Sequence, residues 1–99
     1  MDDKIIIKVD PDLADLIPEY LVNRRQDVES ITLALVSGDF ESIRITGHSL
    51  KGSGGGYGFP GLTDIGNEIE KSAAQKDGKN ISMWVGELSS YLNRLEVVY

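Results

Sequence analysis

The chain has 99 residues, of which 40% are hydrophobic and 26% charged, with a formal net charge of −6. These values suit one small globular domain, and the acidic balance argues against partners that attract clustered Lys and Arg, such as nucleic acid or an anionic membrane surface. Cysteine is absent and there is one histidine, which excludes disulfides and thiolate chemistry and argues against a zinc site or a Ser-His-Asp hydrolase.

Targeting signals are also missing from the sequence. It contains no apolar run of about 18 residues, the length needed for a transmembrane helix. The start MDDKIIIKVD lacks the basic and long apolar regions of a signal peptide. We therefore expect a cytoplasmic protein without a membrane partner.

Residues 1–9 form a lead-in whose apolar run, Ile5 to Ile7, could be a short strand or an extended arm. Next, Asp10-Pro11 is typical of an N-cap followed by proline at the first helical position. A short helix would carry Leu13, Leu16 and Ile17 before Pro18 interrupts or restarts it.

Four longer stretches then place apolar residues at helical spacing. Gly38 is expected to end the first stretch and Asp39 to cap the second. Pro60 opens the third, Gly78 ends it, and Asn80 caps the fourth. The apolar stripes are Leu21, Val28, Ile31 and Leu35; Phe40, Ile43 and Leu50; Leu62, Ile65, Ile69 and Ala73; and Ile81, Trp84, Leu88, Tyr91, Leu92 and Leu95. The short connections predict an all-α, antiparallel up-down four-helix bundle over residues 10–99, with a short extra N-terminal helix.

The stretch GHSLKGSGGGYG, from Gly47 to Gly58, holds the only histidine. It matches neither the dinucleotide-binding fingerprint nor the P-loop, because the required glycine and Gly-Lys spacings are missing. A helix fits better, although a frayed helix end or loop over Gly56 to Gly58 is an alternative. At about 100° per residue, Ile43, Leu50, Gly54 and Tyr57 would face the core.

On this helix His48 points outward, on the same side as Arg44, Lys51, Gly52 and Gly55. The alternative is a histidine that simply fills space in the core. Because each interior glycine costs about 1 kcal/mol relative to alanine, Gly52 and Gly55 indicate access to His48. Gly54 and Gly58 would instead permit close helix packing.

Lys51 lies at i+3 from His48, so the two side chains are neighbours on the helix surface. Its ammonium would disfavour the imidazolium form, keep the ring nucleophilic and offset the charge of a phosphoryl group. The alternative is an ordinary solvated lysine. Glu68 and Glu70 are interpreted as solvated charges, because two carboxylates two residues apart point to different faces. We therefore expect no second base beside His48.

The run His48-Ser49-Leu50-Lys51-Gly52, followed by Gly55, Gly58, Leu62, Ile65-Gly66 and Ile69-Glu70, resembles the histidine phosphotransfer (HPt) domain of bacterial phosphorelays. The resemblance implies a four-helix bundle in which His48 accepts a phosphoryl group from a receiver aspartate and relays it to another. It makes Lys51 the nearby cation and Gly52 the small residue that leaves the ring accessible. Gly47 departs from the family, which often has alanine there, and is expected only to loosen the helix slightly.

The same resemblance implies a phosphocarrier without kinase activity or a cofactor of its own. Mg²⁺ would belong to the receiver partner, and a hybrid sensor histidine kinase could also be a partner or contain this domain. We expect a monomer. Ile45, Arg44 and Gly55 would contact the receiver, although Ile45 could instead be buried against a neighbouring helix and Arg44 could be a lone surface charge. The competing function is a helical protein-interaction module that is never phosphorylated.

Overall fold

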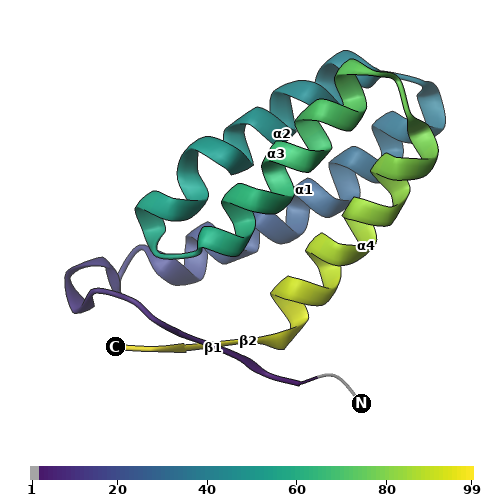
Figure 1. Ribbon diagram of the computed structural model, residues 1–99. Coiled ribbons are helices and arrows are strands. Elements are labelled where there is room, and N and C mark those ends of the chain that lie inside the picture. The colour runs from purple at the N-terminus through teal and green to yellow at the C-terminus, as the bar shows by residue number, and fades with distance from the viewer. Residues whose placement is uncertain (1–2) are drawn as a thin grey trace.

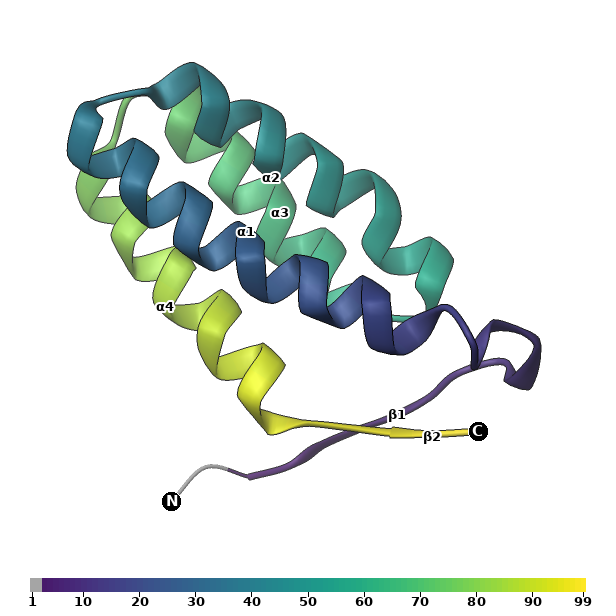
Figure 2. The ribbon, with the colours of Figure 1, turned by 180° about the vertical axis from the view of Figure 1, so that it is seen from behind.

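The computed structural model describes residues 3–99 and contains four α-helices, α1 (Ile17–Ser37), α2 (Phe40–Gly54), α3 (Pro60–Ala74) and α4 (Gly78–Arg94) (Figure 1). The connections between consecutive helices lie at alternating ends of the bundle (Figure 1). Seen from behind, α1 lies between α2 and α4 (Figure 2), and it contacts both. The prediction of an all-α protein with four helices is confirmed. Within the described part of the chain, no helix is long and apolar enough to cross a membrane.

The expected short N-terminal helix is a single 3-10 turn, Pro11–Leu13. Asp10 caps this turn, its carboxylate accepting a hydrogen bond from the backbone N–H of Asp12 at 2.9 Å. Ile17 belongs to α1, where Pro18 occupies the first turn. Proline is tolerated there because the first N–H groups of a helix have no intrahelical partner. Pro18 therefore starts the long helix and does not break a shorter one.

The junction between α1 and α2 follows the prediction. Gly38 ends α1 in the left-handed conformation, with φ of 71°. The side chain of Asp39 caps α2 by accepting a hydrogen bond from the backbone N–H of Ser42 at 3.1 Å.

The junction between α3 and α4 differs from the prediction. Gly78 does not end α3; it is the first residue of α4. The left-handed turn falls on Lys76, with φ of 55°. Asp77, not Asn80, is the N-cap, and its carboxylate accepts from the Asn80 backbone N–H at 3.1 Å. Asp and Asn are equally good caps, so the pattern alone allowed either.

The lead-in contains a strand. β1 (Ile5–Lys8) pairs in parallel with β2 (Leu95–Val98), with Ile5 opposite Leu95. Val9 continues the pairing, since its N–H donates to the Val98 carbonyl at 2.8 Å. The placement of Leu95 in the last helical stripe was wrong, because the backbone becomes extended at this residue.

The predicted stripes of the four helices converge on one core. Ile43 and Leu50 of α2 are fully buried. The remaining buried apolar residues are Val9, Ile17, Tyr20, Ile31, Phe59, Leu62, Ile65, Ile69, Ala73, Ile81, Leu88 and Leu92. The core thus includes all four residues predicted for the third stripe.

Helices α2 and α3 share the most extensive contact of any pair of helices, and glycine makes this possible. A Cβ atom on Gly66 would lie 2.5 Å from the Lys51 backbone N and 2.8 Å from the Gly47 carbonyl O. A Cβ atom on Gly47 would lie 2.7 Å from the Glu70 backbone N. Gly47 therefore does more than loosen its helix, because it permits direct contact between the two backbones.

Candidate functional site

His48 lies in the middle of α2, and its side chain is 70% exposed. The predicted outward orientation is therefore observed, and the alternative of a core histidine is wrong. The ring stands on the surface that α2 and α3 share, where it has one close partner from α3.

That partner is Glu70, whose Oε2 lies 2.8 Å from Nδ1 of His48. Its other oxygen, Oε1, accepts a hydrogen bond from Lys51 Nζ at 3.4 Å. The Glu70 side chain is only 20% exposed. The interpretation of Glu70 as a solvated charge was wrong, as was the expectation that no basic group stands beside His48. One carboxylate joins the histidine to the lysine.

The contacts of Glu70 with His48 and Lys51 determine the charge of Glu70 and which ring nitrogen of His48 carries the hydrogen. Partial desolvation raises the pKa of Glu70, but the hydrogen bonds from His48 and Lys51 lower it by more, so its pKa lies below the ordinary value. At neutral pH Glu70 is ionised and can only accept hydrogen bonds. Nδ1 of His48 must therefore carry the hydrogen, and in the neutral ring Nε2 keeps a free lone pair. This is the nitrogen that does not face Glu70.

The glycine contact between α2 and α3 places these groups together. Gly47 directly precedes His48, and the backbone it touches on α3 is that of Gly66 and Glu70. Packing of the two helices at this distance brings Glu70 within hydrogen-bonding range of a ring 22 residues away in the chain. In the sequence this contact corresponds to two glycines, Gly47 and Gly66, but neither one alone indicates that the two helices touch there.

A comparison with family models bears on this arrangement. The family model described as Hpt domain matches residues 15–97, which include all four helices and most of β2. The chain belongs to the Hpt domain family. No curated protein and no solved structure matches it. Hpt domains are phosphocarriers of two-component phosphorelays and interact with receiver domains.

Gly52, Gly55 and Gly58 follow His48 in the chain of this Hpt domain, at the end of α2 and in the turn after it. A Cβ atom on Gly52 would meet nothing within 4 Å, so no packing inside the molecule requires a glycine there. Gly55 begins a 3-10 turn, Gly55–Tyr57, and Gly58 ends it in the left-handed conformation with φ of 95°. The α-helix therefore ends before Gly56, as the alternative expected, but the segment forms a 3-10 turn and not a frayed end.

Thr63 of α3 holds this end of α2 in place. Its hydroxyl accepts a hydrogen bond from the Gly55 backbone N–H at 2.9 Å. The same hydroxyl donates to the Lys51 carbonyl at 3.0 Å. One side chain of α3 thus bonds both to a donor and to an acceptor in the last turn of α2.

The other residues that the Hpt resemblance suggested for docking lie on the same helix. Ile45 is 56% exposed, so it is available for contact and is not buried against a neighbour. Arg44 pairs with Glu41 through two hydrogen bonds, of 3.1 Å and 2.6 Å. Because the Arg44 charge already has a partner, an acidic partner group would have to compete with Glu41.

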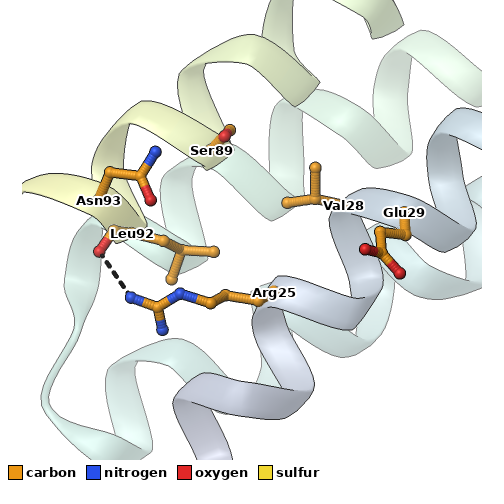
Figure 3. A pocket seen from close by; sticks show the side chains of 6 residues that line it. All are labelled: Arg25, Val28, Glu29, Ser89, Leu92 and Asn93. Atoms are coloured by element: carbon orange, nitrogen blue, oxygen red, sulfur yellow. Dashed lines mark hydrogen bonds between the residues drawn. The ribbon is translucent and has the colours of Figure 1, made fainter.

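A separate hollow of about 210 Å³ lies between α1 and α4 (Figure 3). His48 does not line it; its walls are Arg25, Val28, Glu29, Ser89, Leu92 and Asn93. Arg25 donates to the Leu92 carbonyl at 3.3 Å, and this carbonyl lies in the last turn of α4, where intrahelical donors are missing (Figure 3). Arg25 thus joins α4 to α1, and the hollow is separate from the surface that carries His48.

Proposed function

We propose that this Hpt domain accepts a phosphoryl group on Nε2 of His48 from the aspartyl phosphate of a receiver domain. It then passes the group to the aspartate of another receiver. The observation that supports this most directly is the contact between Glu70 and Nδ1, which leaves Nε2 of an exposed ring free to attack. In this proposal the chain is a carrier without kinase activity of its own.

The reaction balances without a further base on this chain. The lone pair of Nε2 attacks the phosphorus atom, and the bond between phosphorus and the aspartyl oxygen breaks, so the receiver carboxylate leaves with that electron pair. The phosphorylated ring keeps its hydrogen on Nδ1 and carries positive charge. Glu70, ionised and 2.8 Å away, stabilises that charge.

The neighbours of His48 have supporting roles in the proposal. The Lys51 ammonium would attract the phosphoryl oxygens as well as Glu70. Gly52 would leave room for the receiver. Mg²⁺ and the acidic pocket that phosphoryl transfer requires would come from the receiver, so this chain needs no cofactor.

The proposed docking surface includes Ile45, Gly55 and Arg44, all near His48 on α2 or the turn after it. Ile45 supplies exposed apolar area. The domain would act as a cytoplasmic monomer, as a free protein or within a hybrid kinase, with consecutive helices antiparallel in up-and-down order.

Phosphorylation of the purified chain by phosphoramidate tests the proposal. Wild type is expected to gain one phosphoryl group that is lost in acid, and His48→Ala to gain none, as measured by intact mass. A panel of receiver domains from the same organism, loaded with acetyl phosphate and Mg²⁺, is then screened as donors. We call the fastest donor the reference receiver.

An unmodified but folded wild type would contradict the proposal and favour a helical interaction module. If phosphoramidate phosphorylates His48 but no receiver does, only the transfer from receiver to histidine would be contradicted.

The Gly52→Ala variant is expected to be more stable than wild type but to accept phosphoryl groups from the receiver more slowly. The unfolding free energy should rise by about 0.5–1 kcal/mol, because alanine favours the helix and its Cβ meets nothing within 4 Å. Transfer from the reference receiver should fall about tenfold or more, because the added methyl group displaces the partner from His48.

Gly86→Ala is the matched control, since Gly86 lies inside α4 and a Cβ atom there also meets nothing within 4 Å. It should gain similar stability in urea denaturation and leave transfer unchanged. Equal transfer rates for the two variants would remove Gly52 from the docking surface.

A further inference from the structure

The end of α2 is built from residues that hold a helix poorly. Gly52 and Gly54 lie in its last turn, Gly55 is its C-cap, and Gly56 follows in the 3-10 turn. Glycine weakens a helix more than any residue except proline, because it has the most backbone freedom to lose. The last carbonyl groups of a helix also lack intrahelical donors. Helix propensity alone would therefore let this end of α2 open.

Lys51, the cation of the proposed site, begins this weak turn. Its Nζ lies 3.4 Å from Glu70 Oε1, and Oε2 of the same carboxylate lies 2.8 Å from Nδ1 of His48. The Lys51 side chain is 45% exposed, and a lysine carries its ammonium on a flexible four-carbon stem. The place of the ammonium therefore depends on where the Lys51 backbone is held.

Thr63 holds that backbone from the neighbouring helix α3. In an uninterrupted α-helix the Gly55 N–H would donate to the Lys51 carbonyl, four residues earlier. The Thr63 hydroxyl bonds to both of these groups, accepting from the N–H at 2.9 Å and donating to the carbonyl at 3.0 Å. One oxygen atom thus bridges the two groups that close the last turn of α2.

The bridge comes from a rigid position. A Cβ atom on Gly54 would lie 2.7 Å from the Thr63 backbone N, so the backbones of α2 and α3 are in direct contact there. The contact of Gly47 with α3 lies on the other side of His48. The stretch of α2 between these two contacts carries both His48 and Lys51. The Thr63 hydroxyl therefore acts at one end of a segment that is already fixed at the other.

The glycines and the bridge have opposite effects on the same turn. A Cβ atom on Gly52 would meet nothing within 4 Å, so packing does not require glycine there, whereas access to His48 does under the proposed function. That access weakens the turn that positions Lys51. A hydrogen-bonded bridge from another helix restores the order of the turn without adding a side chain at position 52.

We propose that Thr63 is a positioning residue for phosphoryl transfer, whose hydroxyl holds the last turn of α2 closed and thereby keeps the Lys51 ammonium beside His48. The proposal rests on the proposed function, because the place of Lys51 matters to the reaction only if His48 accepts a phosphoryl group. Thr63 acts through Lys51 and takes no part in the bonds that form and break.

The test measures phosphorylation of Thr63→Val and Thr63→Ser by phosphoramidate, a small donor that reacts without a receiver. Valine is close to threonine in shape but lacks the hydroxyl, so the second-order rate constant should fall about three- to fivefold. Serine keeps the hydroxyl and should retain most of the wild-type rate. Thr32→Val is the control and should react like wild type, because the Thr32 hydroxyl donates to the Val28 carbonyl of its own helix, at 2.7 Å.

A double-mutant cycle with Lys51→Ala tests the route of the effect. Lys51→Ala alone should react about tenfold more slowly than wild type, because a charge that attracts the phosphoryl oxygens is lost. Adding Thr63→Val should slow it no further, since the bridge then has no ammonium to place. A merely structural residue would slow both backgrounds by the same factor.

Amide hydrogen exchange gives a readout that does not depend on phosphorylation. The Gly55 N–H should exchange faster in Thr63→Val than in wild type or Thr63→Ser, because local opening of the last turn exposes it to water. Unchanged exchange would show that the hydroxyl does not hold the turn closed, and the proposal would be wrong.

Two kinetic results would also overturn it. One is a wild-type rate in Thr63→Val, and the other is equal slowing by this substitution with and without Lys51. Failure of the proposed function is distinguishable, since phosphoramidate would then leave wild-type His48 unmodified, and the positioning role would fall with it.

Discussion

The Gly66→Ala variant is expected to lose about 2 kcal/mol of unfolding free energy, a large part of the roughly 5–15 kcal/mol typical of small domains. A Cβ atom at this position would lie 2.5 Å from the Lys51 backbone N and 2.7 Å from the Leu50 Cβ. These atoms cannot rotate away, so α2 and α3 must separate. Overpacking costs about 1–3 kcal/mol, and contact with fixed backbone atoms places this variant at the upper end; the better helix propensity of alanine returns about 1 kcal/mol.

Urea denaturation at neutral pH measures this loss, with Gly86→Ala as the control that should become more stable. Because the separation also moves Glu70 away from His48, modification by phosphoramidate should slow in the folded variant. An unfolding free energy equal to or above that of wild type would show that the two helices adjust without strain, and our account of their contact would be wrong.

The Glu70→Ala variant is expected to react with phosphoramidate about tenfold more slowly than wild type. This is less than the hundredfold or more contributed by groups that transfer a proton directly, since Glu70 only positions and polarises the ring. Without the carboxylate 2.8 Å from Nδ1, the hydrogen of the neutral ring can move to Nε2 and block the attacking lone pair. Glu70→Gln should recover part of the rate, because an amide oxygen can still accept from Nδ1.

The pH dependence gives a second readout for Glu70. Its pKa is lowered in the folded protein, so its stabilising contribution is present above the unfolded pKa and is lost as the pH falls through the lower folded value. The stability difference between wild type and Glu70→Gln should therefore shrink in acid, below about pH 4, as Glu70 becomes protonated. Equal phosphoramidate rates in wild type, Glu70→Ala and Glu70→Gln would remove Glu70 from the mechanism, leaving it a structural residue.

The sequence was sufficient for the helices and for the orientation of His48, because both depend on local periodicity. The apolar spacing of Ile43 and Leu50 defines the buried side of α2, and His48 falls on the opposite side without any knowledge of the other helices. The α3–α4 junction was less determined, because Asp77 and Asn80 are both good caps and only the packing selects between them. The strand β1 was ambiguous, since three consecutive isoleucines have no period.

The contact between His48 and Glu70 could not be predicted from local patterns. It joins residues 22 positions apart and depends on how closely two backbones approach. Gly47 and Gly66 control that distance, but each glycine alone also fits a flexible or merely weakened helix. The two glycines indicate a close helix contact only when they are known to face each other, and the periodicity of a single helix does not reveal this.

The parallel pairing of β1 with β2 has a consequence for the order of folding. Ile5 is opposite Leu95, so this contact closes a loop of about 90 residues, whereas α2 and α3 are neighbours in the chain. Closing a long loop costs entropy before its few hydrogen bonds form. The strands should therefore dock late on the pathway, after the helical hairpin that holds His48. The phosphoacceptor region would then reach its native arrangement while the two ends of the chain are still separate.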